Sequence, residues 1–156
     1  MSTRQISVIT FIAFSAILCA AACINVSNSS KPDKELIGTV WDLQSFEETG
    51  GTTTPVGSQG ITLVFSKNGS IIEGKSYTIQ GETIPGNAYG GVYGIEKDRG
   101  IVIDSLWSTK VGLPAGSRYN EYLEALDNAS AYEIDGNKLR IYYFSKSKVL
   151  NFLAKE

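Results

Sequence analysis

The side chains that most often perform catalysis near neutral pH are scarce in this sequence. Its 156 residues include no histidine, and the two cysteines, Cys19 and Cys23, both lie in an apolar N-terminal run. The rest of the chain therefore has no imidazole base, no Ser-His or Cys-His pair, no disulfide and no cysteine metal site. We expect a protein that is not an enzyme and that uses no metal or cofactor.

Two short segments could nevertheless suggest chemistry. In Ser108-Thr109-Lys110 a desolvated lysine could activate a hydroxyl for hydrolysis. Adjacent residues rarely aim both groups at one point, so a loop held by Ser and Thr hydrogen bonds explains this segment better. The glycine-rich residues 86–91 resemble a phosphate-binding loop, but strand residues follow them instead of the helix that such a loop opens.

Acidic residues offer two candidate pairs for glycoside cleavage, Glu47 with Glu48 and Asp42 with Asp104. The separation of the two carboxylates decides that chemistry, and the sequence does not give it. With 16 acids in the chain, some pair always looks suggestive. These residues are therefore weak candidates.

The segment Asp135-Gly136-Asn137 resembles part of a calcium loop. The later ligand positions, with Arg140 and Tyr142 among them, carry the wrong side chains for calcium. We expect a hairpin turn here.

Aromatic residues are the more informative surplus. Core packing accounts for many of them, but a single sheet face has little room for two Trp and eight Tyr residues. Tyr and Trp combine apolar area with a polar tip, which suits recognition surfaces. The candidate recognition surface consists of five residues, Trp107, Tyr89, Tyr93, Tyr142 and Tyr143.

The overall charge argues against one class of partner. The chain has 14 basic and 16 acidic residues, a net charge of −2. Because no basic field exists to hold a phosphate backbone, we expect no nucleic acid partner.

The N-terminus predicts export. Arg4 precedes an apolar run that ends in Ala20-Ala21-Ala22-Cys23, and small residues before a cysteine resemble the lipobox of prokaryotic lipoproteins. We expect residues 1–22 to be a signal peptide and Cys23 to carry a lipid that anchors the protein to a membrane of the cell envelope, facing the periplasm or the exterior. The same run also fits soluble secretion or an uncleaved membrane anchor.

The polar residues that follow cannot build a core, so 23–35 read as a flexible tether and 36–156 as one domain. In that domain, apolar residues alternate in short runs separated by turn residues, which predicts an antiparallel sheet. Asn68-Gly69 predicts a hairpin turn. The expected strands are 40–46, 61–66, 70–79, 89–93, 101–107, 131–134, 139–144 and 149–153.

One helix is predicted over residues 117–128, with Ser117 as the N-cap. Its apolar stripe has helical spacing and needs a sheet to cover; it consists of Tyr119, Tyr122, Leu123, Leu126 and Ala129. The expected fold is mainly β (α+β): a small, strongly bent antiparallel sheet or barrel of about seven to eight strands, closed on one side by this helix near the C-terminal third.

Six sequence pieces in order resemble the META domain, the module of HslJ-like heat-shock lipoproteins of bacterial envelopes. The pieces are Leu36-x-Gly38-Thr39-x-Trp41-x-Leu43-x-Ser45-Phe46, Ile61-Thr62-Leu63-x-Phe65-Ser66-x-Asn68-Gly69, Gly86-Asn87-x-Tyr89-x-Gly91-x-Tyr93, Ser108-Thr109-Lys110 with the helix Ala125-Leu126, Tyr132-x-Ile134-x-Gly136-Asn137-x-Leu139-x-Ile141, and Leu150-x-Phe152. The resemblance implies a small β-rich envelope domain, tied in some members to stress or drug tolerance, with no agreed enzymatic activity.

The sequence departs from that family at one point. Members usually carry a cysteine before the Asn of the middle motif and another after the Ser-Thr-Lys stretch, where this chain has Gly86 and Gly112-Leu113. The favoured hypothesis is a non-enzymatic protein that binds an envelope protein or an amphipathic ligand through its aromatic surface. Two alternatives stay open: a lipocalin-like carrier of a hydrophobic ligand inside the barrel, and a hydrolase.

Overall fold

Alternation of apolar and polar residues produces nine strands in the part of the chain that the computed structural model describes, which is residues 35–48, 50–72, 75–83, 86–109 and 111–156. The predicted signal peptide, Cys23 and most of the tether lie outside these residues. The strands are β1 (Val40–Glu48), β2 (Thr53–Pro55), β3 (Thr62–Ile72), β4 (Lys75–Glu82), β5 (Ala88–Ile95), β6 (Ile101–Ser108), β7 (Ala129–Asp135), β8 (Lys138–Tyr143) and β9 (Lys148–Ala154).

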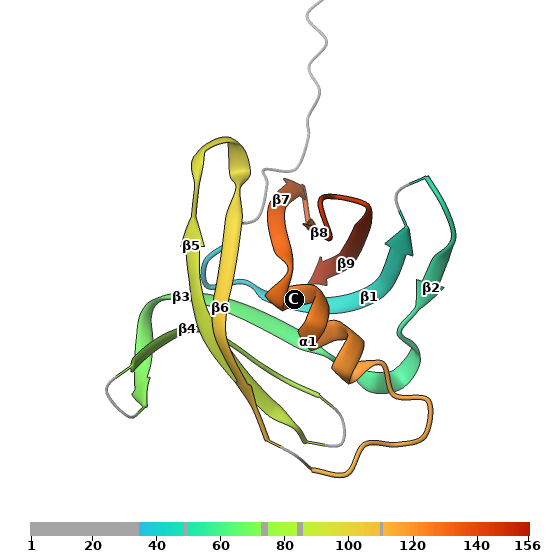
Figure 1. Cartoon of the computed structure of the whole chain (residues 1–156), viewed down its shortest axis with the longest axis horizontal. Coiled ribbons are helices and arrows are strands. Elements are labelled where there is room, and N and C mark those ends of the chain that lie inside the picture. The colour runs from blue at the N-terminus through green and yellow to red at the C-terminus, as the bar shows by residue number, and fades with distance from the viewer. Residues whose placement is uncertain (1–34, 49, 73–74, 84–85, 110) are drawn as a thin grey trace, which may run out of the picture.

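All strands join one antiparallel sheet in the order β6-β5-β4-β3-β1-β9-β8-β7, with β2 paired to β1. Register shifts in the β1–β9, β3–β4, β5–β6 and β7–β8 pairs bend the strands. The sheet curls so far that a bridge joins Gly100, just before β6, to Ala131 of β7 (Figure 1). The prediction of a mainly β, strongly bent antiparallel sheet is confirmed.

The helix α1 (Tyr119–Asp127) lies across the open side of the curled sheet (Figure 1). It begins two residues later than predicted, because Arg118 takes the cap position. Ser117 still supports the start of the helix, since its hydroxyl accepts the Tyr119 N–H at 3.3 Å. Among the described residues, no helix combines the length and apolar character needed to cross a membrane.

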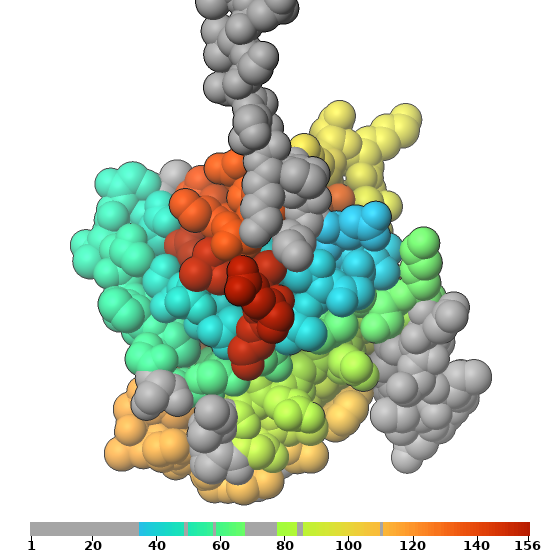
Figure 2. Space-filling model, turned by 180° about the vertical axis from the view of Figure 1, so that it is seen from behind, coloured from blue at the N-terminus to red at the C-terminus, as the bar shows by residue number. Residues whose placement is uncertain are grey.

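The helix and the inner sheet face bury a common core, whose largest fully buried side chains are Trp41, Tyr89, Tyr122, Tyr143, Phe65, Phe152, Ile61, Leu63, Ile79, Ile101, Leu126 and Leu139. Seen from behind, the C-terminal residues lie against the segment around β1 (Figure 2), where Lys155 N–H donates to the Val40 carbonyl at 2.8 Å. This contact and the β1–β9 pairing tie the two ends of the domain together.

One predicted turn is wrong. Asn68 and Gly69 lie within β3, and the chain reverses beyond Ile72, which faces Lys75 of β4. The stretch of β3 between Phe65 and Ser70 is longer than the stretch of β4 opposite it, so these residues form an irregularity in the ladder instead of a turn.

Candidate functional site

The five aromatic residues predicted to form a recognition surface do not share one surface. Tyr89 and Tyr143 are only 1% and 2% exposed, so their placement on the surface was wrong. Both occupy inward positions of their strands and belong to the hydrophobic core. Tyr93 is half-buried, with its ring edge-on to Phe65 at a centroid distance of 5.0 Å.

The other two aromatic residues of that set are partly exposed. Tyr142 lies on β8, where its hydroxyl donates to Glu133 at 2.8 Å and the Arg140 guanidinium stands over its ring. Trp107 lies on β6, and β6 and β8 are far apart in the sheet order. Of the five residues, Trp107 and Tyr89 line the pocket described below.

The acidic pairs considered for catalysis are separated or engaged elsewhere. Glu47 accepts a hydrogen bond from Asn151 at 2.9 Å, and Glu48 pairs with Lys148 at 3.8 Å. Asp42 and Asp104 lie on β1 and β6, with three strands between them in the sheet. Neither pair forms a two-carboxylate site.

The segment 135–137 forms the turn between β7 and β8, as predicted, with Gly136 at φ 60°. Within the described residues, no group of three or more His, Cys, Asp or Glu side chains could hold a metal ion.

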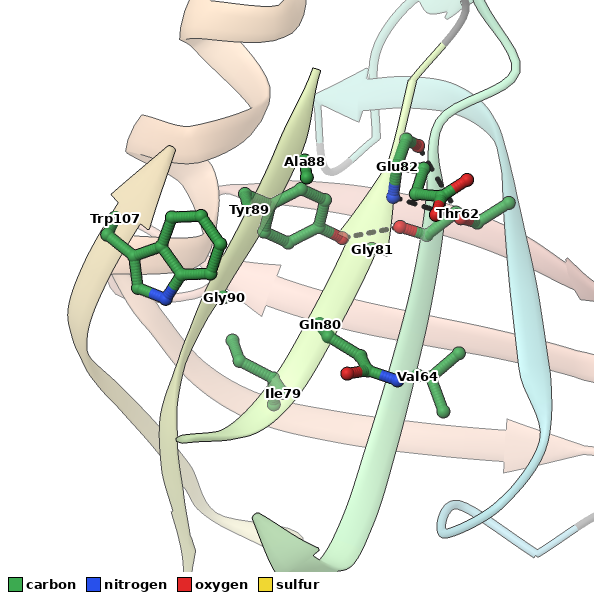
Figure 3. A pocket seen from close by; sticks show the side chains of 10 residues that line it. All are labelled: Thr62, Val64, Ile79, Gln80, Gly81, Glu82, Ala88, Tyr89, Gly90 and Trp107. Atoms are coloured by element: carbon green, nitrogen blue, oxygen red, sulfur yellow. Dashed lines mark hydrogen bonds between the residues drawn. The ribbon is translucent and has the colours of Figure 1, made fainter. Parts of the chain in front are cut away.

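A pocket of about 320 Å³ lies on the outer face of the sheet (Figure 3). Alternate residues of three strands face it, and one residue of β6 forms its wall. They are Thr62 and Val64 of β3, Gln80 and Glu82 of β4, Ala88 and Gly90 of β5, and Trp107 of β6. Because side chains alternate between the two faces of a strand, the residues that line this pocket are the outward-facing residues of neighbouring strands.

Two glycines shape this part of the sheet. Gly90 lies opposite Trp107 in the β5–β6 pair, and a Cβ on Gly90 would stand 2.8 Å from the Trp107 Nε1. A Cβ on Gly81 would stand 1.9 Å from the Thr62 carbonyl oxygen and 2.3 Å from the Tyr89 hydroxyl. Because these glycines have no side chain, the Trp107 indole can pack against Gly90 on the outer face of the sheet and the Tyr89 ring against Gly81 on the inner face.

Tyr89 and Tyr122 form a buried hydroxyl pair behind the pocket. The Tyr89 hydroxyl donates to the Thr62 carbonyl at 2.5 Å, so its oxygen accepts from the Tyr122 hydroxyl, also at 2.5 Å. Burial, reinforced by Tyr122, raises the pKa of Tyr89 well above its usual value. Burial also raises the pKa of Tyr122 strongly. Both phenols stay protonated at neutral pH, so this pair supplies structure and not a general base.

The Asn87 side chain links the Gly86-Asn87 motif to the segment that begins at Ser108. Asn87 is fully buried, and its Oδ1 accepts the Val111 N–H at 2.9 Å and the Thr109 hydroxyl at 3.3 Å. Its Nδ2 donates to the Val111 carbonyl at 3.3 Å. The hydrogen-bonded loop expected for residues 108–110 is thus present at Thr109. The Asn87 side chain links the segment that begins at Gly86 to the one at Val111, next to Gly112.

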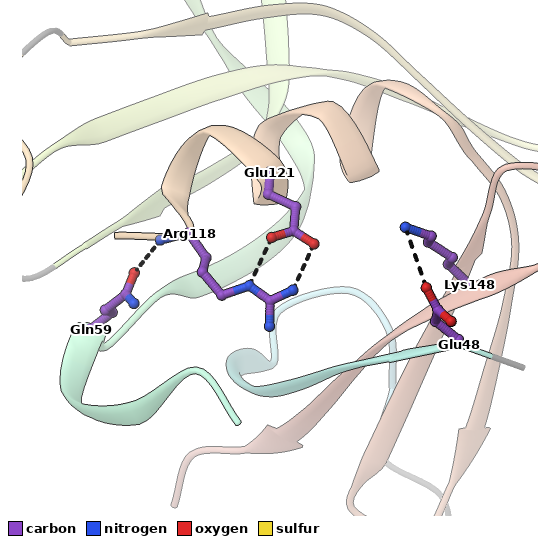
Figure 4. Close-up of polar contacts among 5 residues, drawn as sticks. All are labelled: Glu48, Gln59, Arg118, Glu121 and Lys148. Atoms are coloured by element: carbon purple, nitrogen blue, oxygen red, sulfur yellow. Dashed lines mark hydrogen bonds and ion pairs between the residues drawn. The ribbon is translucent and has the colours of Figure 1, made fainter. Parts of the chain in front are cut away.

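The start of α1 is held from another direction (Figure 4). The Gln59 Oε1 accepts the Arg118 N–H at 3.0 Å, and Arg118 makes two hydrogen bonds to Glu121 at 2.7 and 2.6 Å. The Arg118 guanidinium lies 4.0 Å from the centre of the Phe46 ring. These contacts fix the helix against the sheet and leave the neighbouring hollow only about 40 Å³ in volume.

Sequence reasoning did not identify Thr62, Gln80 or Glu82 as pocket residues. The usable signal was alternation, which places them outward. The alternation of residues could not show which side chain packs against each glycine, because Trp107 and Gly90 are brought together only by the pairing of β5 with β6.

Comparisons with known proteins agree with this architecture. The family model for the META domain matches residues 34–156. No curated protein sequence matches the chain. An NMR structure of a protein from Burkholderia xenovorans is similar over 77% of this chain and 83% of its own, with 22% identity and a TM-score of 0.55. A crystal structure of a DUF4847 family protein from Bacteroides vulgatus is similar over 76% of this chain and 93% of its own, with 22% identity and a TM-score of 0.54. At this identity, both similarities concern the fold alone.

Proposed function

Because this chain belongs to the META domain family, we propose that it is a non-enzymatic binding protein of a prokaryotic cell envelope, anchored by a lipid on Cys23. Its outer-face pocket takes the apolar part of an amphipathic ligand, which is either a small molecule or a side chain of an envelope protein. The observation that carries this proposal is the half-buried Trp107 indole beside a hollow floored by Gly90.

The chemistry of the pocket suits a ligand with two unlike ends. Trp107, Val64 and Ala88 offer apolar surface, and an indole adds an attraction for cations over its face. Gln80 and Glu82 are exposed at the same pocket and can accept hydrogen bonds. Since Glu82 is the charged residue among those that line the described pocket, a ligand with a cationic or donor group is favoured.

The interior of the sheet gives less support to a lipocalin-like carrier. Aromatic rings fill that space: Tyr122 packs edge-on against Tyr89 at a centroid distance of 5.5 Å and against Phe152 at 6.4 Å. A hydrolase also lacks support, because neither of the acidic pairs considered for catalysis forms a two-carboxylate site.

Two aromatic probes of opposite charge test the pocket. In ¹H–¹⁵N NMR titrations we expect 2-phenylethylamine to shift the amides of Gly81, Glu82 and Gly90 and the Trp107 indole N–H, and phenylacetate to shift them much less. Trp107→Ala should raise the Kd obtained from these titrations at least about tenfold, equivalent to the loss of ~1.4 kcal/mol of binding free energy.

The matched control is Val102→Ala, which removes exposed apolar surface from the same strand but outside the pocket. Equal shifts with both probes, or shifts that survive Trp107→Ala, would exclude this pocket as the binding site. The anchor has its own test in mass spectrometry of the mature N-terminus, where an unmodified Cys23 or a retained Met1 would contradict lipidation.

A further inference from the structure

A second hollow lies between β6 and α1, and the Trp107 side chain is part of its wall. Its volume is about 380 Å³, within the range of about 300–1,000 Å³ that is typical of small-molecule sites. It is lined by Leu106, Trp107 and Ser108 of β6 and by Leu123, Glu124 and Asp127 of α1. The outer-face pocket extends from Trp107 toward β3, and this hollow extends from Trp107 toward α1. The two together form a groove that passes over Trp107.

Acidic side chains lie on both sides of Trp107 in this groove. Glu82 of β4 lines the outer-face pocket, and Glu124 and Asp127 of α1 line the second hollow. All three side chains are exposed, and none of them makes an ion pair with another described residue. Among the described residues, no lysine or arginine lines either hollow. Both ends of the groove therefore favour a cationic group.

The middle of the groove is apolar. Val64 and Ala88 contribute to the first hollow and Leu106 and Leu123 to the second, with the Trp107 indole between them. Strands β3, β4 and β5 each pair with a neighbour on both sides, so their backbone groups are already bonded within the sheet. The backbone of a bound peptide would find few partners there. An alkyl chain needs none and can lie on the indole.

The spacing of the strands sets the length of a ligand that reaches both ends. Glu82 pairs with Ala88 of β5, whereas Trp107 pairs with Gly90, two residues further along β5. With ~4.8 Å between strands and ~3.4 Å per residue, the Cα atoms of Glu82 and Trp107 lie about 12 Å apart. The acids of α1 lie beyond Trp107. One ammonium group cannot contact both ends, so a ligand that uses both needs two.

We propose that this groove binds a linear alkyl chain that carries an ammonium group near each end, the chemistry of a long diamine or polyamine. One ammonium group lies at Glu82, the alkyl chain lies along Trp107, and the second ammonium group lies at Glu124 and Asp127. This inference rests on the outer-face pocket of the proposed function and extends it to a second hollow and a ligand class. Once one ammonium group is held, the other binds in an intramolecular step, which raises the affinity.

The probe is 1,8-diaminooctane, with octylamine as the analogue that has one ammonium group and octanedioate as the analogue of opposite charge. In ¹H–¹⁵N NMR titrations of the protein, the diamine should shift the amides of Glu82 and Gly90 and those of Leu123, Glu124 and Asp127 with a single Kd. Octylamine should bind at least about tenfold more weakly. The shorter 1,4-diaminobutane cannot reach both ends and should bind no better than octylamine. Octanedioate should give no saturable shift.

The double variant Glu124→Gln/Asp127→Asn removes both carboxylates of the second hollow at exposed helix positions. We expect it to raise the Kd of 1,8-diaminooctane at least about tenfold, toward the value for octylamine, because the second ammonium group loses its partners. Binding of 2-phenylethylamine at the outer-face pocket should stay unchanged. The matched control is Glu96→Gln/Asp98→Asn, which removes the same charge from exposed positions between β5 and β6, outside both hollows, and should leave both Kd values unchanged.

The outcomes separate this inference from the function proposed above. If 1,8-diaminooctane and octylamine bound equally, or if the amides of α1 did not shift, the second hollow would not take part and this inference would be overturned. The proposed function would then still stand if 2-phenylethylamine bound as expected, and would fall as well if it did not. Tighter binding of tetralysine than of the diamine would also overturn the inference, since the ligand would then be a peptide.

Discussion

On each face of strands β3 to β6 an aromatic ring packs against a glycine, but the ring on the inner face is buried and the ring on the outer face is partly exposed. On the inner side the Tyr89 ring lies against Gly81, and on the outer side the Trp107 ring lies against Gly90 (Figure 3). Tyr89 is 1% exposed and its hydroxyl bonds both Thr62 and Tyr122, whereas Trp107 is half-buried at the edge of a hollow. An aromatic ring packed against a glycine can thus belong to the buried core, as Tyr89 does, or form the wall of a surface pocket, as Trp107 does.

The atoms that surround each glycine explain the difference. The nearest atom to a Cβ on Gly81 would be a backbone oxygen, at 1.9 Å, and the nearest to a Cβ on Gly90 would be a side-chain nitrogen, at 2.8 Å. A backbone atom in a paired strand cannot move without breaking the ladder, whereas the half-buried Trp107 side chain can shift by turning about its own side-chain torsions. The inner contact is therefore rigid and the outer one adaptable.

Gly81→Ala tests the inner contact and should have the largest effect. Relieving the clash with Thr62 requires β3 and β4 to separate, so we expect a loss of more than about 4 kcal/mol of unfolding free energy, in the range that few single substitutions reach. Urea denaturation followed by circular dichroism measures this loss.

The control for that substitution is Gly94→Ala on β5, where a Cβ would meet nothing within 4 Å. It should change the unfolding free energy by less than ~1 kcal/mol. If the two alanine variants were equally stable, the close approach of Tyr89 and Thr62 to Gly81 would not limit the fold.

The hydroxyl pair should show an asymmetry of intermediate size. Tyr89→Phe leaves both the Thr62 carbonyl and the Tyr122 hydroxyl without a partner, and each buried unsatisfied group costs about 1–3 kcal/mol. Tyr122→Phe removes one donor and leaves Tyr89 bonded to Thr62, so it should cost only ~1 kcal/mol. Chemical denaturation of the two variants compares these losses, and a larger loss in Tyr122→Phe would reverse the donor assignment.

The inner face was largely predictable from the sequence. Alternation located eight of the strands and the helical stripe located α1, because both patterns follow from burial of one face. The exception was Asn68-Gly69, where turn propensity was outweighed by a ladder irregularity inside β3. The short strand β2 also escaped prediction, since its three residues are exposed and polar or proline.

The outer face was predictable only in part. The sequence suggested Trp107 as a candidate recognition residue, and Trp107 does line the outer pocket. The same reasoning also placed Tyr89 and Tyr143 on the surface, although both are buried, since composition does not tell which way a tyrosine points. Their burial follows from strand register and from the hydroxyl partners of Tyr89, which lie 27 and 33 positions away along the chain. Such nonlocal contacts leave no trace in local periodicity.

Gly90→Ala tests the outer contact and should have the smallest effect on stability. A Cβ would stand 2.8 Å and 3.0 Å from two indole atoms of Trp107 and 3.1 Å from the Ile79 carbonyl oxygen, so the indole has to move while the strand stays in place. We expect a loss of about 1 kcal/mol, at the low end of overpacking. We also expect a clear shift of the Trp107 indole N–H resonance, with that of the buried Trp41 unchanged. A loss as large as that of Gly81→Ala would show that Trp107 is held as rigidly as Tyr89, and the contrast between an adaptable outer face and a rigid inner one would then be lost.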